Sequence, residues 1–223
     1  RSRFDEYLEV ILKAWTNEIF SFQGEHFSCT DVGIAPHPYQ LPHPPVTVGI
    51  TSVDSFPIIG EMGYSILINP SRVFTLTELE PHIQKYRAAW KQAGHAGRPK
   101  VGLRMPFYVA ETAEKAYSEP KESAMNSIRR LGERVAGLAD FRGTTGDWGV
   151  EGQRIMDMEY EDWLRDKVVF GTPDAAIEKI NGLRQTLDLD QIMFEINFGN
   201  LVPYELQTKS LKLITREVLP NCR

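Results

Sequence analysis

The sequence predicts an α/β fold built on a parallel sheet, and two observations carry this prediction. Short β-branched, apolar runs such as 46–50 and 101–109 alternate with segments whose apolar residues recur at helical spacing. Strands that alternate with helices pair in parallel through helical crossovers. Four such units follow an opening helix. They fit either an open doubly wound sheet or half of a (β/α)8 barrel, and the periodicity leaves both alternatives open.

The strand signals are short apolar runs bounded by turn residues. Strands are expected at 46–50, 64–68, 101–109 and 191–197. Pro106 makes the end of the third strand irregular, because proline cannot donate a ladder hydrogen bond. The segment 24–45 is rich in glycine and proline, and we interpret it as a surface loop that leads into the first strand. Residues 1–223 are therefore expected to form a single domain.

The helix signals are apolar faces and capping residues. Helices are expected at 4–15, 53–62, 79–90, 112–138, 159–164, 173–183 and 203–218. Thr77 and Glu80 have capping-box spacing, and Thr172 has the place of an N-cap before a helix-starting proline. Pro120 breaks the longest helix. Residues 139–166 include a glycine-rich stretch without periodicity, and we expect an excursion or mobile loop there.

Composition and charge exclude several functional classes. A net charge of −5 without any basic block argues against a nucleic-acid partner. No apolar run approaches the length of a membrane-spanning helix, and residue 1 does not open a signal peptide. Cys29 and Cys222 are too few for a disulfide framework, so a cytoplasmic location is expected. The five histidines show no ligand spacing, so we expect no metal site.

The turn after the first strand is the most informative candidate site. Active sites of (β/α)8 barrels lie at the carboxyl ends of the strands. Gly49 lets a ligand approach the backbone, and Thr51, Ser52 and Ser55 offer hydroxyl donors at a helix N-terminus that favours an anion. The alternative is that Ser52 or Asp54 merely caps the helix.

The other candidates carry weaker signals. Arg72, after the second strand, could bind a phosphate or substrate, or could be an ordinary exposed loop arginine. Glu195 and Asn197 alternate with apolar neighbours and either contact a ligand inside the barrel or form a satisfied polar layer there. Trp148 belongs either to a lid or to a loop packed on the barrel wall. The sequence contains no Ser-His-Asp set, P-loop or dinucleotide fingerprint.

Six stretches, taken together and in this order, resemble the luciferase-like flavin-dependent monooxygenases. Each is a weak match alone, but their order and intervals span nearly the whole chain and are specific in combination. The stretches are RFDEYL at 3–8 with LKAW at 12–15, FQGEHF at 22–27, PHPYQ at 36–40, PPVTVG at 44–49, FGTPD at 170–174 and the tail at 199–220.

The resemblance implies a luciferase-like (β/α)8 TIM barrel, of which this chain carries the second half, strands 5–8. In the resembled family the turn that follows Gly49 binds the phosphate of flavin mononucleotide (FMN), and Thr51, Ser52 and Ser55 match the positions of its contacts. The histidine often implicated in the family's chemistry has no counterpart here. The catalytic residues are therefore expected in an N-terminal half outside this sequence, which we interpret as a fragment or an incomplete sequence.

The activity that the resemblance implies is that of an oxidoreductase. The resemblance implies a bacterial, cytoplasmic FMN-dependent monooxygenase that uses reduced FMN and O2 to oxidise a small organic substrate. A flavin reductase supplies the reduced FMN, and the enzyme is expected to be a homo- or heterodimer. Three alternatives remain: a deazaflavin (F420)-dependent oxidoreductase on the same barrel, a non-catalytic flavin-binding or partner subunit, and an unrelated doubly wound binding protein.

Overall fold

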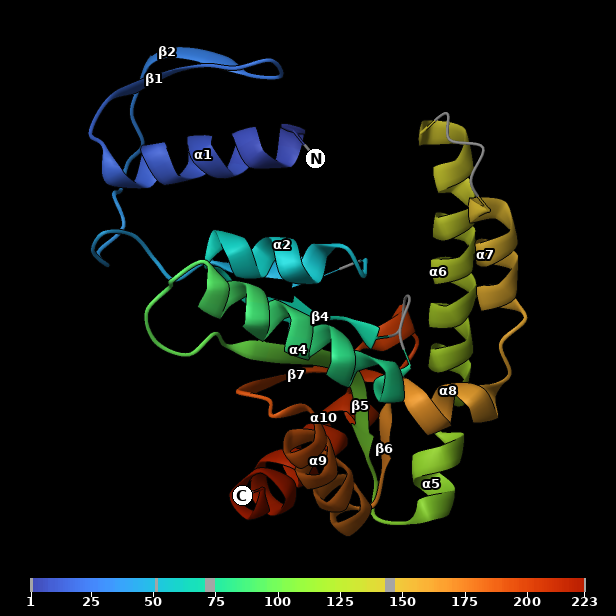
Figure 1. The fold of residues 1–223 in the computed structure, drawn as a ribbon. Coiled ribbons are helices and arrows are strands. Elements are labelled where there is room, and N and C mark those ends of the chain that lie inside the picture. Colours follow the sequence, from blue (N-terminus) through green and yellow to red (C-terminus); the bar gives the residue numbers. More distant parts are fainter. Residues whose placement is uncertain (1, 51, 71–74, 143–146, 223) are drawn as a thin grey trace. The chain divides into compact units, whose positions relative to one another are not determined.

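The computed structural model describes residues 2–50, 52–70, 75–142 and 147–222, which fall into two compact units, Arg1–Val46 and Thr47–Arg223 (Figure 1). The strands are β1 (Phe20–Gln23), β2 (Ser28–Val32), β3 (Thr47–Ile50), β4 (Ser65–Ile68), β5 (Val101–Val109), β6 (Val169–Gly171) and β7 (Gln191–Glu195). The larger helices are α1 (Ser2–Thr16), α2 (Ser55–Met62), α4 (Leu76–Gln92), α5 (Ala113–Ser118), α6 (Lys121–Arg142), α7 (Trp148–Met156), α8 (Tyr160–Asp166), α9 (Pro173–Leu187) and α10 (Tyr204–Leu213). The single-domain organisation remains a prediction, and each unit is treated separately below.

The first unit consists of α1 and an antiparallel hairpin. The opening helix is confirmed. The segment 24–45, expected to be a surface loop, instead contains β2, which pairs with β1 immediately before the segment, with Phe22 opposite Cys29. Phe20 and Phe22 are buried, and the residues between and after them are exposed. This alternation covers four residues only, and it is too short to stand out beside the glycines and prolines that follow it.

The second unit is built on a five-stranded parallel sheet. Strand β3 pairs with β4, and β4 pairs with β5. On its other side β5 pairs first with β7, from Gly102 to Pro106, and then with β6, from Phe107 to Val109. The predicted parallel sheet is thus confirmed. It has one more strand than expected, β6, which was missed in the sequence because it has only three residues. The predicted last strand ends at Glu195, so Asn197 lies beyond it.

Each strand has a core-facing side and an opposite side. Leu103, Met105 and Phe107 of β5 belong to one apolar cluster, together with Ile66 and Ile68 of β4. The same cluster includes residues of α2, α4 and α9 and of the chain after α10. The alternate residues of the strands, which include Gly49, Arg104 and Glu195, therefore lie on the opposite side of the sheet.

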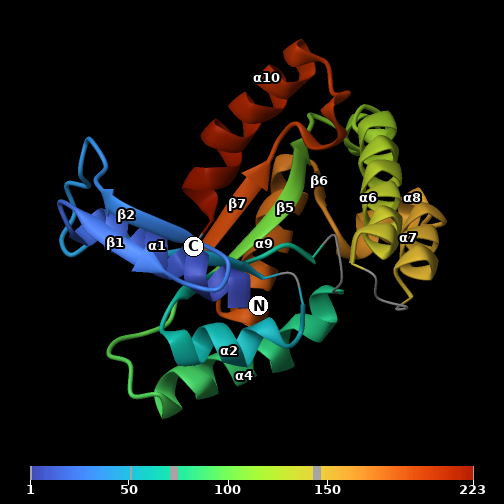
Figure 2. The ribbon, with the colours of Figure 1, turned by 90° about the horizontal axis from the view of Figure 1, so that it is seen from above.

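The order of the strands favours a barrel wall over a doubly wound sheet. The long strands β3, β4, β5 and β7 are neighbours in chain order, without the reversal that marks a doubly wound sheet. Helices α2 and α4 pack side by side (Figures 1 and 2), and both contribute to the cluster on one side of the sheet. Sequential parallel strands with helices on one face are the pattern of a (β/α)8 barrel. That this sheet is half of such a barrel remains a prediction.

The segment expected to be an excursion or mobile loop is largely helical. Within 139–166, α6 ends and α7 and α8 follow, and α6 and α7 pack closely against each other (Figures 1 and 2). Gly132 and Gly152 allow this contact, because a Cβ on Gly152 would lie 2.6 Å from the Gly132 carbonyl oxygen. Of the glycines that suggested a loop, Gly152 is therefore a helix-packing glycine, whereas Gly143 and Gly146 lie outside the described residues. The mobility of this segment remains a prediction.

Two capping predictions have different outcomes. Thr172 accepts a hydrogen bond from the backbone N–H of Ala175 and begins α9, as predicted. The capping box of α4, however, is formed by Thr75 and Glu78 rather than by Thr77 and Glu80, because the helix begins at Leu76. The Glu78 carboxylate accepts from the Thr75 backbone N–H at 3.0 Å. The two pairs have the same spacing, so the sequence pattern alone could not choose between them.

None of the helices in the described ranges is both long enough and apolar enough to cross a membrane.

Candidate functional site

The turn between β3 and α2 presents paired hydroxyl groups at a helix start. The Oγ atoms of Ser52 and Ser55 lie 2.8 Å apart. The Ser55 backbone N–H donates to the Ser52 carbonyl oxygen at 3.2 Å, which closes the turn. Asp54, at the N-cap position, makes no side-chain capping hydrogen bond. The turn therefore keeps hydroxyl groups for a ligand, whereas the first two N–H groups of α2 donate to the carbonyl oxygens of Ser52 and Val53.

Open space lies above the strand that leads into this turn. Gly49 is exposed, and a Cβ built on it would meet no atom within 4 Å. Packing within the chain therefore does not require glycine there, whereas a ligand close to the backbone would. The interpretation that Ser52 or Asp54 caps α2 is wrong for Asp54, and the Ser52 hydroxyl bonds to Ser55 instead. Thr51 lies outside the described residues.

A second group of polar residues surrounds a cavity of about 240 Å³, which we call the arginine cavity. It lies where β4, β5 and β7 meet α6. The cavity is lined by Asn69, Arg104, Ser127, Arg130, Leu131, Arg134, Glu195, Asn197, Gly199 and Asn200. Glu195 and Asn197, two of the residues predicted from the sequence, are thus brought to one site.

Glu195 forms an ion pair across the sheet. Its Oε1 lies 2.8 Å from the Arg104 guanidinium, and both side chains are partly exposed. Arg104 of β5 pairs with Met193 of β7, so Glu195 lies two positions further along the neighbouring strand, on the same side of the sheet. The pair lies on the side of the sheet opposite the apolar cluster, the same side as Gly49. The pair contributes to the wall of the arginine cavity, and whether Glu195 contacts a ligand or belongs to a polar layer stays a prediction.

The loop after β7 is held in place against α6. The Ser123 hydroxyl donates to the Phe198 carbonyl oxygen and accepts from the Leu201 backbone N–H. The Asn126 amide donates to the Gly199 carbonyl oxygen at 2.7 Å. Gly199 has a φ of 68°, which favours glycine. Asn197 is exposed at the start of this short loop, and its position is fixed by these contacts.

Two other residues named in the sequence analysis, Arg72 and Trp148, are not among the described residues that line the arginine cavity. Arg72 lies outside the described residues. Trp148 begins α7 and packs against a second apolar cluster that includes Ile128, Val135 and Ile155. This contact agrees with a packed aromatic residue rather than an exposed lid residue.

The arginines of the cavity were missed at the sequence level. Arg104 is the one charged residue in the nine-residue apolar strand β5, and that signal could have identified it. Arg130 and Arg134 are four residues apart on α6 and resemble an ordinary solvated helix face. Only the packing of α6 next to the loop after β7 shows that they line a cavity.

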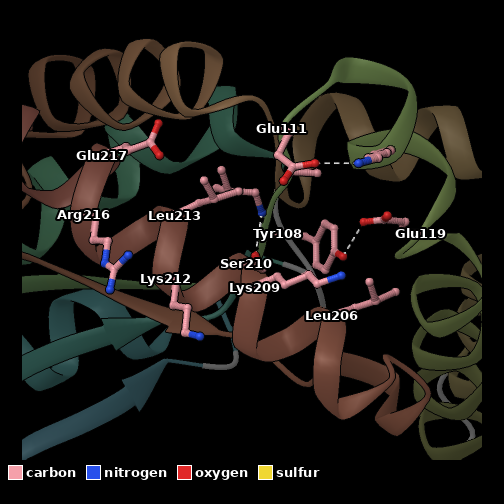
Figure 3. Close-up of a pocket in the computed structure, with 13 residues that line it drawn as sticks. Tyr108, Glu111, Glu119, Leu206, Lys209, Ser210, Lys212, Leu213, Arg216 and Glu217 are labelled. Carbon is pink, nitrogen blue, oxygen red and sulfur yellow. Dashed lines mark hydrogen bonds and ion pairs between the residues drawn. The ribbon is translucent and has the colours of Figure 1, made fainter.

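Another cavity, of about 230 Å³, lies between α5, α10 and the end of β5 (Figure 3). Several of its polar groups are bonded to one another. The Tyr108 hydroxyl donates to Glu119 at 2.6 Å, and the Lys115 ammonium donates to Glu111 at 2.5 Å. On the other wall the buried Ser210 hydroxyl accepts from the Val109 backbone N–H at 2.8 Å. These bonds join α5 and α10 to β5, so we assign this region a structural role.

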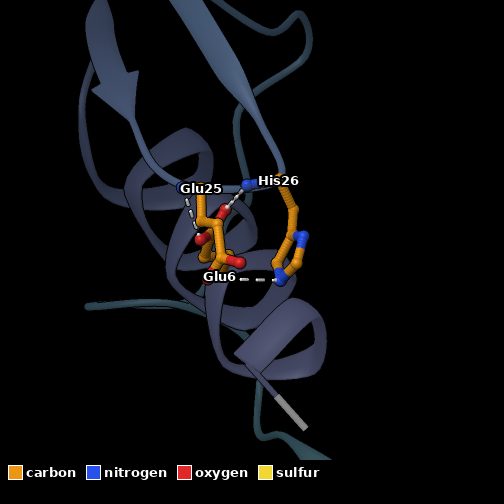
Figure 4. A group of neighbouring side chains, drawn as sticks. All are labelled: Glu6, Glu25 and His26. Carbon is orange, nitrogen blue, oxygen red and sulfur yellow. Dashed lines mark hydrogen bonds and ion pairs between the residues drawn. The ribbon is translucent and has the colours of Figure 1, made fainter.

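In the first unit, Glu6, Glu25 and His26 bring three ligand atoms within 4.8 Å of one another (Figure 4). The Glu6 carboxylate accepts backbone hydrogen bonds from Glu25, His26 and Phe27 at 2.7, 2.9 and 3.1 Å. These bonds attach α1 to the hairpin turn and use the lone pairs that a metal would require. The cluster is explained by this structural role.

Comparison with known proteins identifies the family. The family model for luciferase-like monooxygenases matches residues 1–189. The chain belongs to the luciferase-like monooxygenase family. Its fold agrees with this assignment. The luciferase-like chain aligns over 99% of its length with a monooxygenase from Streptomyces bottropensis, at 21% identity and a TM-score of 0.72, and covers 61% of that protein. The unrelated doubly wound binding protein is thereby excluded.

Two further relatives use different cofactors. An FMNH2-dependent dimethylsulfone monooxygenase from Pseudomonas putida is 24% identical over 188 residues, which are 82% of this chain and 50% of the relative. A coenzyme F420-dependent tetrahydromethanopterin reductase from Methanopyrus kandleri shares the fold with a TM-score of 0.68 and 19% identity, over 100% of this chain and 63% of that one. The luciferase-like chain therefore spans about half the length of the curated relative.

Proposed function

We propose that this protein is an FMN-dependent monooxygenase that uses reduced FMN and O2 to oxidise a small organic substrate. Family membership over residues 1–189 is the observation that carries the proposal. The FMNH2-dependent relative supports FMN as the cofactor. The F420-dependent reductase shares the fold to a similar degree, so a deazaflavin-dependent oxidoreductase is the second candidate.

The residues of the β3–α2 turn fit the phosphate of FMN. The Ser52 and Ser55 hydroxyls would hold the phosphate, and Thr51 would add a third hydroxyl. Gly49 would let the ligand lie against the backbone of β3. No lysine or arginine is needed there, because a helix N-terminus already favours an anion.

Reduced FMN, when bound, supplies the electrons with which O2 is activated. The chain's own residues contribute binding and orientation. The Arg104–Glu195 pair lies on the same side of the sheet as Gly49, and we assign it to the wall of the substrate site. The groups that exchange protons with substrate or O2 are proposed to lie outside this sequence.

Partners and location follow from the same proposal. The protein requires a flavin reductase, and we propose a homo- or heterodimeric assembly in the cytoplasm.

Turnover with and without oxygen tests the proposal. The protein is supplied with reduced FMN or reduced F420, aerobically and anaerobically, together with a panel of small organic substrates. We expect substrate oxidation only with reduced FMN and O2. Anaerobic hydride transfer with F420 would favour the second candidate, and flavin binding without any substrate-dependent oxygen consumption would favour a non-catalytic subunit.

A further inference from the structure

The arginine cavity carries excess positive charge. Three guanidinium groups, of Arg104, Arg130 and Arg134, face one carboxylate, that of Glu195. Glu195 is paired with Arg104 at 2.8 Å. Across the ranges that the structure describes, neither Arg130 nor Arg134 has an ion-pair partner. The guanidinium groups of these two exposed arginines are therefore available to a ligand at this cavity.

The two unbalanced arginines project from one face of α6. The residues of this helix that line the cavity are Ser127, Arg130, Leu131 and Arg134, at helical intervals of three and four. Arg130 is also held from the opposite wall. With the Asn200 amide oxygen turned towards it, Arg130 Nη1 donates at 3.3 Å, and the Asn200 amide nitrogen donates to the Asn197 carbonyl oxygen at 3.2 Å.

The wall opposite α6 is held by hydrogen bonds. The loop that carries Asn197 and Asn200 is fixed to α6 by Ser123 and Asn126, as described above. A site whose groups are held in place before binding does not lose conformational entropy when the ligand arrives. Helix α6 and the loop together therefore keep the guanidinium and amide donors of this cavity near one another.

The size and donor chemistry indicate an oxyanion. Guanidinium forks match the planar or tetrahedral oxygens of carboxylates, sulfonates and phosphates. A volume of about 240 Å³ is below the range of roughly 300–1,000 Å³ that holds whole small ligands. We propose that the arginine cavity binds an oxyanion group at one end of the organic substrate. This inference rests on the proposed function, because it assigns the cavity to that enzyme's substrate.

Sulfate is the probe that tests the cavity itself. Sodium sulfate is titrated calorimetrically into the full chain at constant ionic strength, with an Arg130→Gln/Arg134→Gln double variant and an Arg129→Gln control. Arg129 is on the same helix but does not line the cavity. We expect the double variant to lose at least tenfold in sulfate affinity and the control to stay within twofold. Undetectable binding by the unmodified chain, or an equal loss in both variants, would overturn the proposal.

Flavin binding identifies the source of the oxyanion. If the cavity serves the substrate, FMN and riboflavin affinities of the double variant stay within twofold of the unmodified chain. A selective loss of FMN relative to riboflavin would mean that these arginines bind the cofactor's phosphate, and the substrate assignment would be wrong. If no flavin bound to any form while the sulfate difference persisted, the proposed function would fail and the oxyanion site would stand.

Discussion

Gly199→Ala probes the loop that forms one wall of the arginine cavity. Gly199 has a φ of 68°, and its α-carbon faces the backbone of Ser123 at the start of α6. A Cβ at this position would collide with the Ser123 carbonyl group. The substitution therefore combines an unfavourable backbone conformation with a steric clash against main-chain atoms that cannot rotate away.

The two effects can be given magnitudes. A non-glycine residue in the left-handed region costs about 1–2 kcal/mol, and overpacking adds about 1–3 kcal/mol. The sum of about 2–5 kcal/mol corresponds to a fall in Tm of roughly 5–15 °C for a chain of this size. The affinity for sulfate should fall as well, because the loop carries Asn200 and its contact with Arg130.

Differential scanning calorimetry of Gly199→Ala is compared with Gly182→Ala in α9. A Cβ on Gly182 would meet no atom within 4 Å, so alanine should raise stability there by about 0.5–1 kcal/mol. The same substitution is thus expected to lower the stability of the fold at Gly199 and to raise it at Gly182. A Tm for Gly199→Ala within about a degree of the unmodified protein would refute the reasoning that the loop after β7 packs tightly against Ser123.

Two further predictions concern the rest of the second unit. Asp188 accepts from Arg98 at 2.7 Å and lies 3.1 Å from Arg87, so Asp188→Asn should cost about 0.5–1 kcal/mol, measured by urea unfolding. Because these side chains are partly exposed, the loss should shrink in 1 M salt, and a salt-independent loss would contradict an electrostatic origin. For Glu78, hydrogen bonds from Thr75 hold the pKa of the carboxyl below its ordinary value of 4.5. The ionised carboxylate therefore stabilises the fold above that value, and the contribution is lost as the pH falls through the lower folded-state pKa. The difference in the free energy of unfolding between the unmodified chain and Glu78→Gln should be constant above about pH 5 and should shrink in acid. A difference that does not depend on pH would disprove the stabilising role of the ionised carboxylate.

The long parallel strands could be predicted because their signal is strong and local. β5 has the predicted bounds, and its nine residues are nearly all buried. The N-cap at Thr172 was equally local. β6 could not be predicted, because three residues carry no periodicity and depend on pairing with the end of β5.

The errors came from residues whose role depends on contacts distant in sequence. Gly152 suggested a loop, yet it lets α7 approach α6 at Gly132. Likewise, Arg130 and Arg134 acquire their place at a cavity only through the loop after β7. Glu195 could be nominated from its alternation with apolar neighbours, whereas its partner Arg104 required the register of β5 and β7.

The central claim is that the β3–α2 turn binds the phosphate of FMN. It is tested most directly by titrating FMN and riboflavin into the unmodified chain and into Ser52→Ala, Ser55→Ala and the control Ser118→Ala. A hydrogen bond to a charged group contributes about 1.5–3 kcal/mol, so each turn variant should lose about tenfold or more in FMN affinity. Riboflavin binding and the Ser118→Ala control should change little. Equal losses for FMN and riboflavin, or no loss for either, would contradict the account.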